Sequence, residues 1–205
     1  MNSQRESATL PQPVDIRSAV DEALVLFASL GIEPVLIGGV ALAVHGIERF
    51  TKDVDFAVTV AESALCEARI ADRAPVPLTI GGVSMQTSSG VRVDLIVRRF
   101  EFQALFEEAI TVARARGKLV TIGMHRIHVV PLTYLVALKM AAGRPADEGD
   151  LSRIVLRDDL NYEEARDVVY RHLGVFAARW LDRLARTHGR KGAPVDDAAG
   201  DENGG

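Results

Sequence analysis

Apolar residues recur at helical spacing near the start of the chain. In VDIRSAVDEALVLFASLG, the residues Val20, Leu24, Phe27 and Leu30 lie three or four positions apart, and the pattern stops at Gly31, a residue type that commonly ends helices. The next apolar run, PVLIGG, is short and ends in two glycines, and VALAVHG after it has helical spacing. We therefore expect a first helix, and then a strand that turns sharply into a second helix.

The middle of the chain alternates between strand and helix patterns. DVDFAV alternates as a strand does, AESALCEARIADR has helical spacing, and GVSMQTS and GVRVDLIV predict two strands joined at Ser89 and Gly90. A helical segment, EFQALFEEAI, and a pair of strand patterns, KLVTIG and RIHVV, follow. We expect a mixed α/β (α+β) fold with a small mixed sheet and flanking helices.

Helical patterns fill the C-terminal third of the chain. They are PLTYLVALKMAAG, DEGDLSRIVLR and NYEEARDVVYRHLGVFAARWLDRLAR. We assign residues 14–130 to a core and residues 131–188 to a C-terminal helical lobe. Because no internal repeat or long linker is visible, we treat the two parts as one unit.

Composition narrows this picture. The 205 residues are 48% hydrophobic and 25% charged, which suffices for one or two hydrophobic cores. The formal net charge of -4 excludes a protein that coats nucleic acid through phosphate contacts alone, although a local basic patch remains possible. Residues 1–12 and 189–205 have little to bury, and we expect both to be disordered.

The chain has no features of a membrane or secreted protein. No apolar run approaches the roughly 18 residues that span a bilayer, and MNSQRESATLPQP lacks the order of a signal peptide. The single cysteine, Cys66, has no partner for a disulfide within the chain and should be a buried apolar residue of a helix. We expect a cytoplasmic protein with no membrane contact.

Three aspartates are candidates for the chemistry. Side chains alternate along a strand, so Asp53 and Asp55 project on the side opposite to Val54 and Phe56. In VRVDLIV the same rule places Asp94 opposite the apolar residues, beside Arg92 and Arg98. If the two strands are neighbours, three carboxylates meet. The alternative is that each is a solvated strand residue, which is the usual case for a lone DxD.

Converging carboxylates suit magnesium chemistry. Mg²⁺ prefers oxygen ligands, bridges a triphosphate and neutralises charge in the transition state of phosphoryl transfer. Two such ions, roughly 3.5–4 Å apart, hold both the attacking and the leaving oxygen, which makes a third carboxylate informative. We therefore predict a site for Mg²⁺, with two ions, at Asp53, Asp55 and Asp94.

The glycine pair Gly38 and Gly39 supplies a candidate phosphate seat. It lies between a strand and a helix N-terminus, where backbone N–H groups are unpaired and a phosphate meets no Cβ. Residues 40–52 leave room for one helix and a loop that return the chain to Asp53. By itself a glycine pair is also typical of an ordinary turn.

These motifs together resemble a known superfamily. VLIGGVALAVHGIERFTKDVDFAV is similar to the nucleotidyltransferase superfamily that includes DNA polymerase beta, and within it to the AbiEii/AbiGii-type toxin family. The signature is a Gly-Gly or Gly-Ser turn, a helix, DxD on the next strand and a third carboxylate on a later strand. Gly38, Gly39, Asp53, Asp55 and Asp94 match these positions in order.

The resemblance extends over about residues 18–160. LKMAAGRPADEGDL looks like the lysine helix of the family followed by a basic residue and spaced aspartates, with Lys139, Arg144, Asp147 and Asp150 in those positions. The chain departs from the family at Gly39, where many members have serine, and at Ala146, where members often carry a second basic residue.

Lys139 has two interpretations. Leu132, Leu135, Val136 and Met140 define the inward stripe of its helix, and Lys139 occupies a stripe position. It either meets the triphosphate as a point charge, or reaches the surface or pairs with a structural acid.

Other residues near these motifs have local explanations beside functional ones. The resemblance implies that Arg49 and Thr51 line the nucleotide pocket. His45 suits a helix end or the core better than a metal site. Asp147 and Asp150 suit the start of a helix, where they also hold Arg144 or Lys139 in place.

A basic cluster near the end of the last predicted helix is a candidate for RNA contact or an ordinary solvated charge run. Its members are Arg183, Arg186, His188, Arg190 and Lys191.

The resemblance implies a Mg²⁺-dependent enzyme that transfers a nucleoside monophosphate from a nucleoside triphosphate to a hydroxyl and releases pyrophosphate. The toxin family suggests tRNA or a protein as the acceptor and a cognate antitoxin as a partner. Two alternatives stay open: an aminoglycoside-type enzyme with a small-molecule acceptor, and a non-catalytic, nucleotide-binding or antitoxin-like regulator. The retention of three acids on matching strand faces argues against the regulator.

Overall fold

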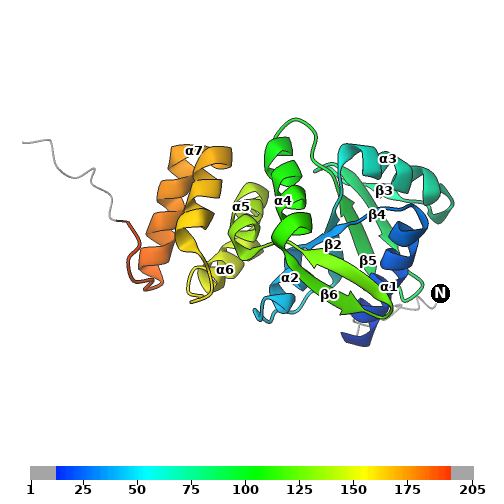
Figure 1. The fold of residues 1–205 in the computed structure, drawn as a ribbon, viewed down its shortest axis with the longest axis horizontal. Coiled ribbons are helices and arrows are strands. Elements are labelled where there is room, and N and C mark those ends of the chain that lie inside the picture. Colours follow the sequence, from blue (N-terminus) through cyan, green and yellow to red (C-terminus); the bar gives the residue numbers. More distant parts are fainter. Residues whose placement is uncertain (1–12, 195–205) are drawn as a thin grey trace, which may run out of the picture.

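A mixed β-sheet lies at the centre of the N-terminal part of the protein. The computed structural model describes residues 13–194, and within them seven strands pair in the order β3-β4-β5-β2-β1-β7-β6 (Figure 1). The β2–β5 and β1–β7 pairs are parallel, and the other neighbours are antiparallel. The strands are β1 Val35–Ile37, β2 Asp53–Ala57, β3 Val76–Pro77, β4 Gly82–Gln86, β5 Arg92–Ile96, β6 Lys118–Ile122 and β7 His125–Val129.

Helices cover both faces of this sheet, which confirms the predicted mixed α/β class. On one face Phe56 packs edge-on against Phe27 of α1, with ring centroids 5.2 Å apart. The other face carries Asp55 and is covered by α4 and α5. The helices are α1 Pro13–Ser29, α2 Gly38–Val44, α3 Val60–Arg69, α4 Gln103–Arg116, α5 Leu132–Ala142, α6 Pro145–Ile154 and α7 Tyr162–Thr187, with a 3₁₀ turn over Ala71–Arg73.

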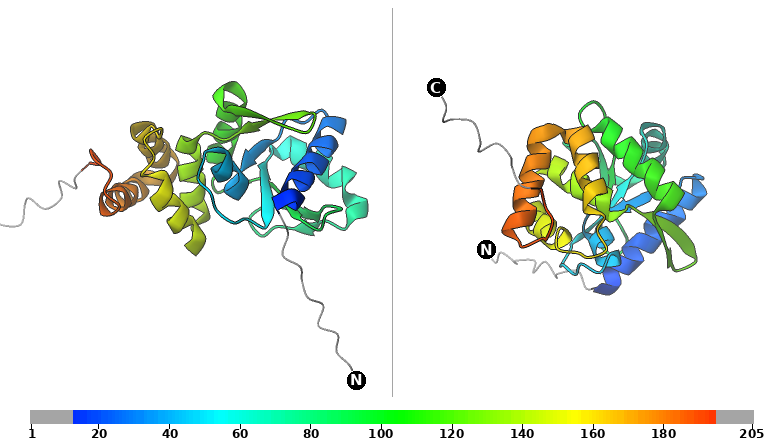
Figure 2. Two further views of the ribbon diagram at one scale, coloured as in Figure 1. Left: turned by 90° about the horizontal axis from the view of Figure 1, so that it is seen from below. Right: turned by 60° about the vertical axis from the view of Figure 1, so that its left-hand side comes forward.

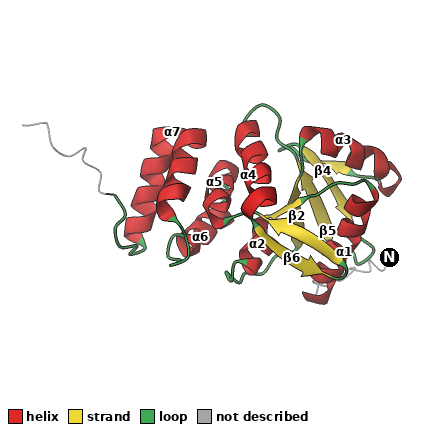
Figure 3. Cartoon of the chain, viewed as in Figure 1, coloured by secondary structure: helices red, strands yellow, loops and turns green. Residues whose placement is uncertain are grey.

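The helices α5 to α7 lie beyond one end of the sheet. Figures 2 and 3 show this part as helices alone, with the strands gathered at the other end of the molecule. Residues Leu132–Lys139 of α5 are all buried, because α5 lies between the sheet and α7. A single cluster of buried residues runs through both parts. None of the helices within residues 13–194 is long and apolar enough to span a bilayer.

The last predicted helix is in fact folded back on itself. Gly174 has φ 85° and ψ 176°, so the run Tyr162–Thr187 breaks there into two antiparallel halves that lie side by side in Figure 1. The Tyr162 hydroxyl donates to Asp182 at 2.9 Å and Arg166 Nε donates to the same carboxylate at 3.0 Å, joining the halves. Helical periodicity persists on both sides of the break, so the sequence pattern does not reveal it.

The predicted disordered tail begins too early. Arg190 donates to the carbonyls of Val155, Arg157 and Leu160, and its guanidinium carbon lies 4.8 Å from the centroid of the Tyr162 ring. Its donors hold the loop between α6 and α7, so this member of the basic cluster is a structural anchor. Residues 1–12 and 195–205, also predicted to be disordered, lie outside the described residues.

Replacement of Gly174 tests the fold-back. A Cβ at this position would meet nothing within 4 Å, so Gly174→Ala should destabilise the protein by about 1–3 kcal/mol through backbone conformation alone. Gly149→Ala is the matched control, because Gly149 lies within α6 and a Cβ there also meets nothing within 4 Å. The control should be neutral or stabilising by up to about 1 kcal/mol. Urea unfolding of both variants measures the difference, and equal effects would contradict the assignment.

Candidate active site

The three predicted carboxylates lie on one face of the sheet. Strands β2 and β5 are parallel neighbours, and their register pairs Asp55 with Asp94 and Asp53 with Arg92. Residues paired across adjacent strands project to the same side, so the condition for the three acids to meet is fulfilled. Asp55 and Asp94 are 7% and 6% exposed, which rules out the interpretation that these two are solvated strand residues.

Asp55 is electrostatically the most strained of the three. Burial, followed by the charges of Asp53 and Asp94, raises the pKa of the Asp55 carboxyl to about 7, against the opposing influence of Arg144 and Lys139. Like charges packed together in a poorly solvated site disfavour ionisation, and a bound cation would relieve that cost. Asp55 is therefore the carboxyl group whose loss of a proton a bound cation would favour most.

Asp94 is held by residues from the neighbouring strand and from its own. Burial raises the pKa of Asp94, while a hydrogen bond from Ser84 and the charge of Arg92 lower it. Ser84 Oγ donates to Asp94 Oδ1 at 2.6 Å from the adjacent strand β4. Ser84 was not singled out by the sequence analysis; its polar position in the alternating segment GVSMQTS was the available signal.

Arg92 bridges two of the carboxylates. Its Nη2 donates to Asp53 Oδ2, and its Nε lies 3.2 Å from Asp94 Oδ1. In this arrangement no group of three His, Cys, Asp or Glu side chains among the described residues is placed to hold a metal ion. The donor set nevertheless fits Mg²⁺, because carboxylate oxygens are its preferred protein ligands and Asp55 carries an unrelieved electrostatic penalty. A cation at these acids would have to displace the Arg92 guanidinium.

The first glycine of the turn is required by Asp55. Gly38 has φ +66°, and a Cβ built there would lie 1.9 Å from Asp55 Oδ2. No side chain fits at this position, since the backbone approaches the carboxylate directly. The glycine turn at the start of α2 is thus packed against the acidic face, as the predicted phosphate seat requires.

The second glycine makes room for Thr51. A Cβ at Gly39 would lie 2.8 Å from Thr51 Oγ1 and 3.5 Å from Arg49 Nε. Thr51 therefore takes the space in which a serine side chain at position 39 would begin. Its hydroxyl lies 3.1 Å from both the backbone carbonyl and Oδ1 of Asp53, so Thr51 orients that carboxylate.

Lys139 lies in a buried network of charges. Its Nζ donates to Asp147 at 2.9 Å and to Asp150 at 2.6 Å, and Lys139 is 3% exposed. Arg49 donates to Asp150 at 2.5 Å, and Arg144 Nε donates to Asp147 at 2.9 Å. Of the two interpretations of Lys139, the structure shows the pairing with structural acids. Burial raises the pKa of Asp147, but the hydrogen bonds from Arg144 and Lys139 outweigh this and lower it.

A pocket opens beside the acids. We call it the Asp55 pocket; it has a volume of 160 Å³ and is bounded by Asp55, Gly38, Ile37, Ile96, Phe106 and Leu135. Lys139 and Arg144 also line it, which joins the charge network to the acidic face. Arg49 and Thr51 do not line this pocket, although the resemblance implied a place in the nucleotide site; they lie against Gly39 on the other side of the turn.

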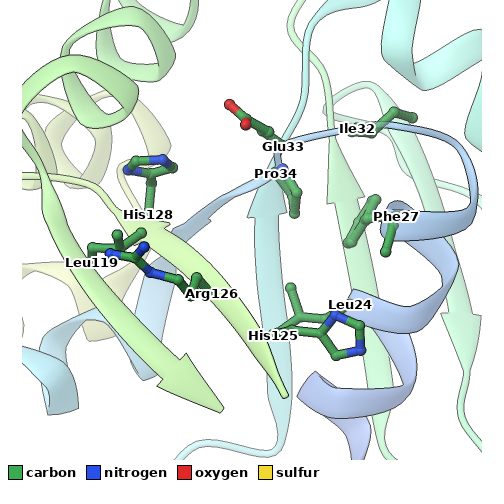
Figure 4. A pocket seen from close by; sticks show the side chains of 10 residues that line it. Leu24, Phe27, Ile32, Glu33, Pro34, Leu119, His125, Arg126 and His128 are labelled. Atoms are coloured by element: carbon green, nitrogen blue, oxygen red, sulfur yellow. The ribbon is translucent and has the colours of Figure 1, made fainter. Parts of the chain in front are cut away.

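A second pocket lies away from the acids. Figure 4 shows it between α1 and the β6–β7 hairpin, with Leu24, Glu33, His125 and His128 around it. It has no lining residue in common with the Asp55 pocket and contains none of the predicted site residues.

Two residues given local roles by the sequence analysis have those roles in the structure. His45 ends α2, and its Nε2 lies 2.8 Å from the carbonyl of Val130, while burial lowers its pKa. Cys66 is fully buried, and burial raises the pKa of its thiol to about 12, aided by Glu62 and Glu67. Neither residue belongs to the site.

Replacement of Asp55 tests its raised pKa. The folded state holds the Asp55 proton up to about pH 7 and the unfolded state only to about pH 4, so ionisation of Asp55 lowers stability as pH rises between these values. Asp55→Asn should therefore have little effect on stability at pH 4 and should stabilise the protein at pH 8 by a few kcal/mol, because a tenfold change in an acid's dissociation constant corresponds to about 1.4 kcal/mol. Urea unfolding with EDTA measures this difference, with Asp72→Asn as the exposed control; a pH-independent effect would disprove the raised pKa.

Removal of Arg92 tests its competition with a cation. Arg92→Ala should tighten the binding of Mn²⁺, used as a probe for Mg²⁺, because a guanidinium no longer pairs with Asp53 and Asp94. The gain should be about two- to tenfold, since Arg92 is half exposed and such pairs are weak. Mn²⁺ titration by electron paramagnetic resonance measures it, and exposed Arg69→Ala controls for net charge. Weaker binding by Arg92→Ala would show that Arg92 does not compete.

No family model and no curated protein sequence matches this chain. Several solved structures are similar to it, including the following two. One is the solution structure of the antibiotic-resistance factor ANT(2'')-Ia, with 14% identity, a TM-score of 0.46, and coverage of 86% of this chain and 94% of that chain. The other is an antigenic nucleotidyltransferase-like protein from Paracoccidioides brasiliensis, with 13% identity, a TM-score of 0.47, and coverage of 85% and 93%. At these low identities, the chemistry of this chain rests on its own residues.

Proposed function

We propose that this protein is a Mg²⁺-dependent nucleotidyltransferase of the superfamily that its motifs resemble. The observation that supports this most strongly is the register of β2 and β5, which sets Asp55 beside Asp94 on the face that carries Asp53. The glycine turn packs against the same face, with Gly38 in contact with Asp55. Acids for a cation and backbone N–H groups for a phosphate thus adjoin, as nucleotidyl transfer requires.

In the proposed reaction, a hydroxyl of the acceptor attacks the α-phosphorus of a nucleoside triphosphate. An oxygen–phosphorus bond forms, the bond between the α-phosphorus and its bridging oxygen to the β-phosphorus breaks, and pyrophosphate leaves with that electron pair. Asp53, Asp55 and Asp94 would hold Mg²⁺, which when bound would supply charge neutralisation for the transition state. Asp94, which accepts a hydrogen bond from Ser84, would accept the proton of the hydroxyl.

The basic residues divide between two roles. Lys139 is committed to Asp147 and Asp150, so it acts by holding α5 and α6 in position. The Arg144 side chain is 62% exposed and lines the Asp55 pocket, with donors in addition to those that Asp147 accepts. Arg144 is therefore the cation that reaches the triphosphate, together with the backbone of Gly38 and Gly39.

The acceptor belongs to the same proposal. The resemblance to the AbiEii/AbiGii-type toxins favours tRNA or a protein, and with it a cytoplasmic toxin that has a cognate antitoxin. A small molecule, as in an aminoglycoside-type enzyme, is the alternative acceptor. A regulator without activity is disfavoured, because such a protein has no need of buried acids at the cost that Asp55 bears. Growth arrest on expression, reversed by an adjacent gene, separates the toxin from the small-molecule enzyme.

A transfer assay tests the proposal. Protein is incubated with Mg²⁺, each α-³²P-labelled nucleoside triphosphate in turn, and total RNA, cell lysate or an aminoglycoside. Wild type and the exposed control Asp72→Asn should transfer label and release pyrophosphate, and EDTA should stop both. The Asp53→Asn, Asp55→Asn double variant should lose at least about 100-fold in rate, the order expected for removal of charge stabilisation. Transfer by the double variant at the wild-type rate, or none by folded wild type with any acceptor, would disprove the proposal.

A further inference from the structure

The Asp55 pocket combines apolar walls with a cation, Arg98, that forms no ion pair with a described residue. Its walls include Phe106 of α4, Leu135 of α5, and Ile37, Ile96 and Asp55 of the sheet. Arg98, which follows β5, forms part of the wall. The pocket therefore suits a flat, largely apolar group with a polar edge.

Arg98 is held in place by contacts that leave one donor unsatisfied. Its Nη1 donates to the carbonyl of Ile80 at 2.9 Å, and its guanidinium carbon lies 5.6 and 5.7 Å from the ring centroids of Phe102 and Phe106. Its Nε is buried without a hydrogen-bond partner. No carboxylate among residues 13–194 forms an ion pair with Arg98, in contrast to Lys139 and Arg144.

An unpartnered N–H of a cation at the wall of a pocket is costly unless a ligand supplies an acceptor. A buried donor without a partner costs about 1–3 kcal/mol, and more when it is charged. The faces of the Phe102 and Phe106 rings stabilise the positive charge of Arg98 through cation–π contacts, but the rings accept no strong hydrogen bond. The side chain is thus preorganised at the pocket wall. Only Nη1 among its nitrogens donates to a described residue, so Nη2 has donors for a group that enters the pocket.

We propose that the Asp55 pocket receives the nucleobase of the nucleoside triphosphate and that Arg98 donates to the polar edge of the base. This inference rests on the proposed function, which places the phosphates at the acids and the glycine turn. Asp55 and Gly38 belong both to that phosphate site and to the pocket wall, so a base joined to the α-phosphate through one ribose reaches the pocket.

The size of the pocket agrees with this occupant. Its volume of 160 Å³ is close to that of cavities, about 150 Å³ and lined by Leu, Ile and Phe, that hold benzene. One six-membered ring of a base fits such a space between apolar walls. The phosphates themselves suit these apolar walls poorly, because a multiply charged group loses much on desolvation and the Lys139 charge is already paired with Asp147 and Asp150.

Binding measurements with two ligands separate the base from the phosphates. The dissociation constants of α,β-methylene analogues of the four nucleoside triphosphates and of inorganic tripolyphosphate are measured with Mg²⁺ for wild type, Arg98→Ala and Arg99→Ala. Arg98→Ala should weaken binding of the best nucleotide on the order of tenfold, as expected for one charge-assisted hydrogen bond, and change tripolyphosphate less than about twofold. Arg99 is exposed, and Arg99→Ala removes the same charge as Arg98→Ala does. This control should change the binding of neither the nucleotide nor tripolyphosphate.

A second variant guards against a folding defect in Arg98→Ala, which is checked by its melting temperature. Ala142 is exposed and lines the pocket, so Ala142→Phe should fold and obstruct the base. It too should weaken nucleotide binding far more than tripolyphosphate binding.

The outcomes distinguish this inference from the proposed function. If wild type transfers label but both variants bind nucleotide as wild type does, the base does not occupy this pocket. An equal loss of nucleotide and tripolyphosphate in Arg98→Ala would assign Arg98 to the phosphates, and a raised KM for the acceptor alone would assign the pocket to the acceptor. Wild type that binds no nucleotide would overturn both proposals.

Discussion

The repulsion among three aspartates on one sheet face is the constraint on which the rest of the site depends. Asp55 and Asp94 are paired across parallel strands and nearly fully buried, and Asp53 lies two residues from Asp55. Such an arrangement survives only if neighbouring groups offset the charge. Arg92 spans Asp53 and Asp94, and Ser84 donates to Asp94. Burial still raises the pKa of Asp94, and burial with the neighbouring charges raises the pKa of Asp55 to about 7. The buried acids therefore lower the stability of the fold, and a bound cation would relieve that cost.

A second network of charges joins the sheet to the helices. Lys139 of α5 contacts Asp147 and Asp150 of α6, and Arg49 reaches Asp150 from the loop that leads into β2. Lys139 also lines the Asp55 pocket, so this network holds part of the wall of that pocket in position. An ion network of this kind loses stability when one partner is removed, because the remaining charge stays buried. It therefore acts as a positioning device for the site.

The two arginines near the acids illustrate how similar residues acquire different roles. Arg92 lies on the same sheet face as the acids and forms ion pairs with two of them, whereas Arg98 lies beyond the end of β5 against two phenylalanine rings. In the sequence, both arginines lie on the same side of the predicted strand as Asp94, and no local pattern distinguishes them. Their separation depends on strand ends and on packing with α4, which residue spacing does not encode.

The sequence by itself determined which residues share a side of a strand. Alternation is a local property, so the common orientation of Asp53 and Asp55 and the glycine turn before α2 followed from spacing alone. The order of the strands, the partners of Lys139, the contacts of Arg92 and Ser84, and the reversal at Gly174 were decided by the tertiary structure. Most of these features join residues far apart in the chain, and such contacts form only when the whole core packs. The reversal at Gly174 depends on a backbone angle that side-chain periodicity does not report.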